Sequence, residues 1–144
     1  MTTITQAQGA RTQVFDMGTL ASATYAVSAV IDLGPDIPLD VTLEIEADPN
    51  GAPTGNKRLV LFAKLSLDSV NFSSGPESGT DTTNEHDLYW IGTLQCADTN
   101  VHRKMFSLQA LPVVRYMKLV IKNELGVPLA SGKIYHAAIT GLSV

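Results

Sequence analysis

Hydrophobic and polar residues alternate along several short segments of the chain. In VTLEIEA, residues 41–47, the apolar side chains fall on odd positions, and a threonine and two glutamates fall between them. Successive side chains of a strand point to opposite faces, so a shift of one residue would bury both glutamates. The segment therefore predicts a half-buried β-strand with its odd positions facing inward.

The segment RYMKLVIKN, residues 115–123, shows the same period. Met117, Leu119 and Ile121 are expected to face inward. The intervening side chains are expected to face outward, and these are Tyr116, Lys118, Val120 and Lys122. Together with residues 41–47, this segment gives the clearest predicted strand.

Further strands are predicted where β-branched, aromatic and aliphatic residues lie between clusters of Gly, Pro, Asn and Asp, which favour turns. They span residues 25–33, 58–67, 88–94, 102–108 and 134–142. Alanines in residues 19–30 would suit a short helix, but Thr24, Tyr25 and Val27 favour a strand. The segments GPDIPLD and ADPNGAPTGNK are predicted connections, because proline is excluded from central strands.

Many short strands with Gly- and Pro-rich connections predict an all-β fold. We expect a single antiparallel β-sandwich over residues 19–144 with jelly-roll-like connectivity. A parallel sheet would need crossover helices, for which the sequence has no pattern. Residues 1–18 are rich in Thr, Gln, Ala and Gly and are expected to form an extended N-terminal arm, with a frayed terminus as the alternative.

Charge and cysteine content exclude several kinds of partner. The net charge is −4, and the 10 Lys and Arg residues are scattered, so no nucleic-acid partner is expected. Cys96 is the only cysteine, which rules out an intramolecular disulfide and fits a protein made in a reducing cytoplasm. The sequence shows no signal-peptide pattern and no apolar run of about 18 residues, so no membrane partner is expected.

The sequence offers little that resembles a reactive or ligand-binding cluster. His86 lies between Glu85 and Asp87, but neighbours in an extended chain point to opposite sides, which favours a polar loop edge over a metal or acid–base site. Cys96 has no electropositive setting that would activate it with His102. We therefore expect no catalytic residues, no metal ion and no cofactor.

The segment SLDSVNFSSGPESGTD, residues 66–81, is a long polar stretch without an apolar period. Long loops in compact domains are usually functional or disordered. We expect a solvated connection or a contact that becomes ordered on assembly. Phe72 would either anchor this loop on the core or contact a neighbouring subunit.

Between Phe62 and Asn123 the chain contains FAKLSLDSVNF, a polar loop, LYWIGTL, VHRKMFSL and LPVVRYMKLVIKNELGVPL, and GKIYHAAITGL follows. This order of features resembles the capsid decoration or cement proteins of tailed bacteriophages. The resemblance implies a jelly-roll-like structural protein of the virion that binds the major capsid protein on the capsid exterior and stabilises the shell. Exposed sheet edges further suggest a homo-oligomer, either a dimer or a trimer.

Apolar residues of the arm and loop are the predicted contacts with this partner, and they are Ile4, Val14, Phe15, Met17 and Phe72. The alternative function is a sugar-binding or host-recognition module of a phage tail or fibre. Such a module would present an exposed aromatic ring, for which Tyr116 is the candidate. Trp90 is in phase with Leu88 and Leu94 and is instead predicted to lie in the core.

Overall fold

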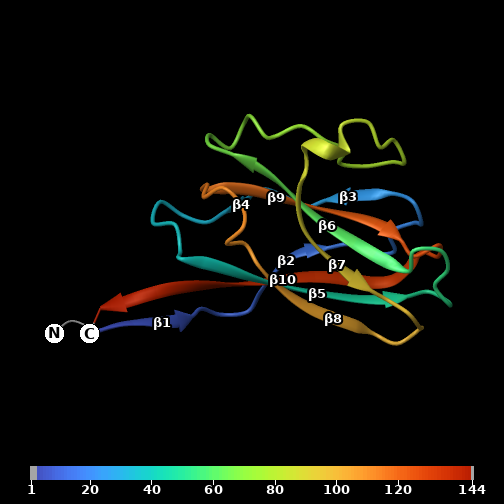
Figure 1. Cartoon of the computed structure of the whole chain (residues 1–144), viewed down its shortest axis with the longest axis horizontal. Helices are drawn as coiled ribbons and strands as arrows, with labels where there is room; N and C mark the ends of the chain where they lie inside the picture. Colours follow the sequence, from blue (N-terminus) through green and yellow to red (C-terminus); the bar gives the residue numbers. More distant parts are fainter. Residues whose placement is uncertain (1–2, 144) are drawn as a thin grey trace.

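The computed structural model describes residues 3–143, except for the side chains of residues 4, 142 and 143. Within this range the chain forms two antiparallel β-sheets and one short 3₁₀ helix, η1 (Glu85–Asp87) (Figure 1). The strands are β1 (Ile4–Gln8), β2 (Thr12–Asp16), β3 (Tyr25–Val27), β4 (Ile31–Asp32), β5 (Asp40–Pro49), β6 (Arg58–Ser66), β7 (Tyr89–Gln95), β8 (His102–Ser107), β9 (Tyr116–Glu124) and β10 (Leu129–Ser143).

The strand order is that of a jelly roll. In the first sheet β10 lies between β2 and β5, β8 follows β5, and β1 pairs with the far end of β10. In the second sheet the order is β3-β9-β6-β7, and β4 also pairs with β9. Early and late strands are thus neighbours in both sheets, as in double-sheet jelly rolls. The predicted antiparallel β-sandwich with jelly-roll-like connectivity is confirmed.

The main core lies between the two sheets and contains the inward faces of the two clearest predicted strands. Val41, Leu43 and Ile45 of β5 are buried there, as are Leu119 and Ile121 of β9. The alternation that predicted these faces is therefore confirmed for both strands.

The predicted strand over residues 25–33 is two short strands. Val27 pairs with Val120, and Ile31 pairs with Met117. The segment between Val27 and Ile31 is therefore one residue longer than the segment of β9 opposite it. Between them, Ser28 uses its backbone N–H to donate to the Leu119 carbonyl, and its hydroxyl oxygen accepts from the Leu119 N–H at 2.9 Å. A serine hydroxyl thus replaces a regular ladder bond and interrupts the strand.

The N-terminal segment lies along β10. Strand β2 pairs with residues 133–136 of β10 within the sandwich, whereas β1 pairs with residues 139–143. Figure 1 shows β1 and the end of β10 leaving the body of the molecule together as a two-stranded ribbon. We call this pair the terminal ribbon.

Candidate functional site

The long polar loop, residues 67–88, lies over the outer face of the second sheet (Figure 1). Leu88 at its end joins Tyr25, Val60, Phe62 and Val120 in a second, smaller apolar cluster. Val120 was expected to face outward and does lie on the outer face, but it is fully buried because the loop covers it. The loop is therefore anchored to the sheet by apolar packing and is not merely a solvated connection.

Lysines of the same face hold the loop by charge. Lys64 is buried, and its Nζ donates to the Gly75 carbonyl at 3.1 Å and to Glu77 Oε1 at 2.9 Å. Lys118 Nζ lies 3.5 Å from the same Glu77 oxygen. The hydrogen bond from Lys64 holds the pKa of Glu77 below its ordinary value, despite partial burial of the carboxyl.

A second ion pair lies near η1, where Lys122 Nζ is 3.1 Å from Glu85 Oε1. We call Lys64, Lys118 and Lys122, with Glu77 and Glu85, the lysine clamp. Two glutamates of one loop are thus bound by three lysines of the sheet beneath it, which fixes the position of the loop.

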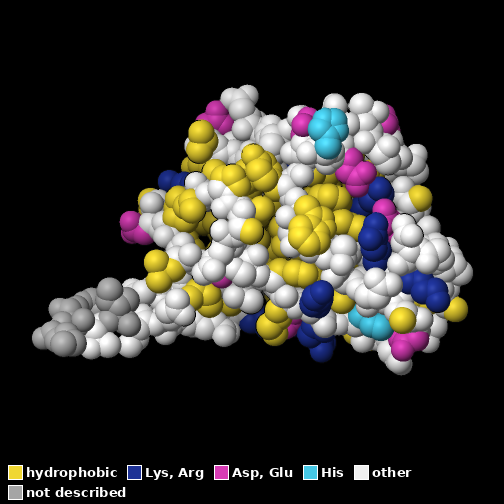
Figure 2. Space-filling view, viewed as in Figure 1, with side chains coloured by type: hydrophobic (Ala, Val, Ile, Leu, Met, Phe, Trp, Pro, Cys, Tyr) yellow, Lys and Arg dark blue, Asp and Glu magenta, His cyan; other side chains and the backbone are white. Residues whose placement is uncertain are grey.

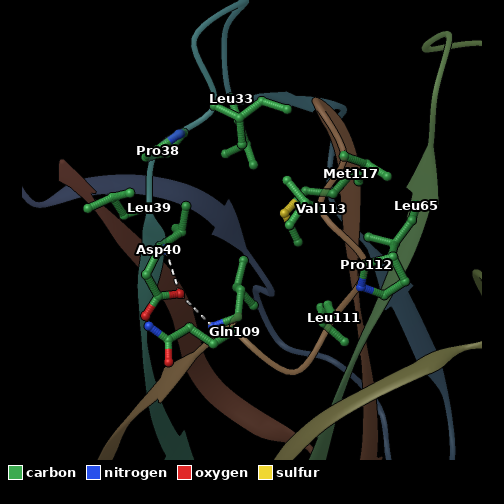
Figure 3. Close-up of a pocket in the computed structure, with 14 residues that line it drawn as sticks. Leu33, Pro38, Leu39, Asp40, Leu65, Gln109, Leu111, Pro112, Val113 and Met117 are labelled. Atoms are coloured by element: carbon green, nitrogen blue, oxygen red, sulfur yellow. Dashed lines mark hydrogen bonds between the residues drawn. The ribbon is translucent and has the colours of Figure 1, made fainter. Parts of the chain in front are cut away.

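A hollow of the surface opens at one end of the sandwich, between the start of β5, the end of β6 and the start of β9. A cavity of about 130 Å³ lies there and is lined almost entirely by apolar side chains. Figure 3 shows Leu33, Val113 and Met117 converging on it from three different segments. A shallower hollow of about 500 Å³ adjoins it along Leu65 and Pro112. We call the two together the apolar groove.

The rim of the groove exposes large apolar side chains. Val113 is 78% exposed, Leu39 is 60% exposed, and Leu67 is 85% exposed. Hydrophobic side chains gather across the middle of the face shown in Figure 2. A contiguous apolar surface rimmed by polar residues is typical of an interaction site in a soluble protein.

Both carboxylates that line the groove are engaged in holding loops. Asp40 accepts from the Ser107 hydroxyl at 2.6 Å and from the Leu108 N–H at 3.1 Å. Asp68 accepts from the backbone N–H groups of Val70 and Asn71, which lowers the pKa of Asp68 well below its ordinary value. These groups are suited to shaping the groove, and the groove itself is suited to binding an apolar partner.

The predicted contact residues are placed very differently. Phe72 lines the groove, and Lys118 Nζ lies 4.5 Å from the centre of its ring. Val14 and Phe15 of β2 are half-buried against the core, and Met17 is buried within it. Ile4 lies in β1, and its side chain is outside the described part of the chain. Phe72 is therefore the predicted contact that the structure brings to the groove.

Sequence reasoning missed most of the groove because its rim comes from connections. Ile37 and Leu39 belong to the Pro-containing segment before β5, and Val113 follows Pro112 in the segment before β9. Residues 34–40 were predicted only as a connection, and no element was predicted for residues 109–114. The usable signal was the presence of large apolar residues inside Pro-containing loops, where no strand can bury them.

The prediction that Trp90 lies in the core is wrong, because its side chain is 60% exposed. A β-bulge inserts Ile91 between two ladder positions opposite β6, which reverses the alternation along β7. Leu94 therefore faces the main core, while Leu88 faces the cluster under the loop. Trp90 lies on the outer side of the second sheet, at the edge strand.

The potentially reactive groups considered in the sequence are Cys96, His86 and His102. Burial raises the pKa of the Cys96 thiol to about 11, which disfavours the thiolate at neutral pH. His102 lies 2.9 Å from Asp98, and His86 is exposed beside Asp87 at 3.5 Å.

Among residues 3–143, no group of three or more His, Cys, Asp and Glu side chains is placed to hold a metal ion. No helix in this part of the chain is long and apolar enough to cross a membrane. No protein-family model and no curated protein matches this chain. Its function is therefore inferred from its sequence and its structure.

Proposed function

We propose that the protein is a non-enzymatic structural protein of a phage virion, which binds the outside of the capsid and stabilises the shell as a decoration or cement protein. The observation that carries the proposal is the apolar groove with its exposed rim. When a partner covers apolar side chains that are exposed in the free molecule, their removal from water contributes favourably to the free energy of binding. The capsid resemblance names the partner, the major capsid protein.

The size of the cavity suits one apolar side chain of a partner protein. An apolar cavity of about 150 Å³ in an engineered protein core binds benzene, so one of about 130 Å³ can receive a leucine or phenylalanine side chain. Leu39, Val113 and Leu67 would then pack around the inserted residue. This arrangement of a central anchor and a surrounding apolar rim is common in protein interfaces.

Rigidity and repetition also fit this function. Strand residues of both sheets, Val41, Leu65 and Met117, form part of the groove, which limits the conformational entropy lost there when a partner binds. A shell offers the same binding surface many times. Modest affinity at each site then stiffens the whole shell when many sites are filled.

The test is to measure the binding of the purified protein to shells that lack it. Val113→Asp is expected to weaken binding roughly tenfold or more, because a carboxylate would be desolvated in the interface. Val101→Asp is the matched control, since Val101 is also exposed and lies in the connection between β7 and β8, away from the groove residues. Equal binding of both variants would contradict the use of the groove.

Mass spectrometry of purified particles provides a separate test of location. A decoration protein is expected at a copy number comparable with that of the major capsid protein. A few copies per particle would instead place the protein in the tail, and its absence from particles would contradict a virion function altogether.

The exposed ring of Trp90 favours a second candidate function, a sugar-binding or host-recognition module. Exposed tryptophan commonly stacks on the apolar face of a sugar ring. If this is the function, a glycan array will show binding that Trp90→Ala abolishes. Tyr116→Ala tests the other candidate ring, which is half-buried with the Arg115 guanidinium 5.1 Å from its centre. Absence of glycan binding would remove this alternative.

A further inference from the structure

We infer that the terminal ribbon is a dimerisation element, in which the end of β10 pairs with the end of β10 from a second copy of this chain. The inference begins with the unequal lengths of neighbouring strands. β10 runs from Leu129 to Ser143, but its pairing with β5 ends at Ile139, opposite Asp40. The segment before β5, which contains a bend and Pro38, does not continue the strand alongside β10. Within the described chain, residues 140–143 of β10 have no strand on that side.

The direction of the free backbone groups follows from one hydrogen bond. Gly9 N–H donates to the Ala138 carbonyl at 2.8 Å, so the backbone groups of Ala138 point toward the N-terminal strands. In an antiparallel ladder these directions alternate from residue to residue. Thr140 therefore bonds β1, while the N–H and C=O of Gly141 and Ser143 point to the free side.

The ribbon has no protection against pairing. Natural edge strands are usually blunted by charged residues, proline or bulges. Strand β8, at the far edge of the same sheet, carries Arg103 and Lys104. In contrast, residues 1–10 and 137–144 contain neither a charged side chain nor a proline. An unprotected edge of this kind is expected to be covered in the functional state.

The terminal ribbon also extends beyond the sandwich of its own chain. It leaves the sandwich as a pair of strands (Figure 1), and an isolated two-stranded ribbon is marginally stable in water. Its side chains are mostly small or polar, and the exceptions are Ile4, Ile139 and Leu142.

A second copy satisfies these requirements. Antiparallel pairing about a two-fold axis at Leu142 places Gly141 of each copy opposite Ser143 of the other, so the free groups of each copy meet those of the other. Because neither edge carries a charged side chain, no like-charge repulsion between side chains opposes this pairing. The product is a four-stranded bridge in the order β1-β10-β10-β1, with a sandwich at each end. This dimer does not depend on the proposed function.

Two proline substitutions distinguish the pairing edge from the opposite one. Gly141 and Gln6 face each other across the ribbon, and their N–H groups point to its two opposite sides. Neither substitution removes a β1–β10 hydrogen bond, because both residues occupy non-bonded positions. Gly141→Pro removes a donor from the proposed interface in each copy, whereas Gln6→Pro imposes the same ring on the outer edge.

Sedimentation equilibrium of the full chain measures the outcome. We expect a monomer–dimer equilibrium that Gly141→Pro weakens roughly tenfold or more and that Gln6→Pro leaves unchanged. Small-angle scattering should show that the dimer is elongated, with the bodies far apart. A chain that stays monomeric up to about 1 mM, or a dimer weakened by Gln6→Pro alone, would overturn the inference.

A cross-linking variant guards against an effect of proline on the ribbon itself. Leu142→Cys should form a disulfide-linked dimer on mild oxidation, since the two copies of residue 142 face each other at the two-fold axis as a non-bonded pair. Gln6→Cys should not, because two strands separate the two copies of residue 6. The native Cys96 is buried and does not compete. Linking through residue 6 in place of residue 142 would contradict the proposed pairing.

Discussion

Replacing Asn123 with leucine is expected to lower the free energy of unfolding by about 3 kcal/mol or more, because buried hydrogen-bonding groups lose their partner. Asn123 lies on β9 in phase with Leu119 and Ile121 and is fully buried. Its amide donates to the carbonyls of Leu20 and Val127, both at 3.0 Å. Its Oδ1 accepts from the Leu125 N–H at 2.8 Å.

Leucine has the same branching as asparagine and a larger volume, so the substitution leaves no cavity, and the loss will come from hydrogen bonding and from crowding by the methyl groups. The Leu20 carbonyl keeps a bond from the Leu129 N–H, but the Val127 carbonyl and the Leu125 N–H lose the partner that Asn123 provides. Asn123 thus connects the segment before β3 to the turn between β9 and β10. Its replacement should weaken the pairing of the early and late strands.

Urea unfolding of wild type and variant measures this effect, and the midpoint should fall while the slope stays constant. Asn50→Leu is the matched control, because Asn50 is exposed at the end of β5. The free energy of unfolding of this variant should lie within about 0.5 kcal/mol of the wild-type value. A loss below about 1 kcal/mol for Asn123→Leu would mean that water replaces the amide in the core.

The sequence predicted the fold wherever alternation ran uninterrupted. Along β5 and β9, the period of two identified the inward residues, since only one register buries the apolar set. It failed at Trp90, because a bulge in β7 depends on the partner strand and leaves no mark in local alternation. It placed Val120 on the correct outer face but did not predict its burial, because that burial depends on a loop from elsewhere in the chain.

The candidate site was harder to predict than the fold for a related reason. The groove is assembled from residues 33–39, 65–73 and 108–114, which are distant in sequence and meet only through the jelly-roll connectivity. Phe72 was identified because an isolated aromatic residue in a polar loop needs a contact. Leu39 and Val113 lie in short Pro-containing connections, where periodicity does not distinguish a surface residue from a buried one and the apolar residue itself is the one signal.

The lysine clamp gives the second large effect. Lys64→Met is expected to speed amide hydrogen exchange in residues 73–88 of the long polar loop by roughly thirtyfold. The reason is that a buried charged hydrogen bond is worth about 2 kcal/mol. Methionine keeps the apolar stem of lysine within the sheet. It removes the donor to the Gly75 carbonyl and to Glu77, so the loop should open locally while β5 and β9 keep wild-type protection.

Lys133→Met is the matched control, because Lys133 lies on β10 in the other sheet, far from this loop in the topology. Exchange in residues 73–88 should be the same as in wild type. Faster exchange throughout the chain of Lys64→Met would instead show that Lys64 supports the whole fold.

Acidification should reproduce the loss of the clamp. Lys64 holds the pKa of Glu77 below its ordinary value, so the ionised carboxylate stabilises the folded loop above the pKa of the unfolded chain. This stabilisation is lost as the pH falls through the lower, folded pKa. The exchange ratio between Lys64→Met and wild type, after correction for intrinsic exchange, should therefore be largest near neutral pH and shrink below about pH 4. A ratio that stays constant to low pH would assign the anchoring to the Gly75 carbonyl and to the apolar cluster, because neither of these titrates.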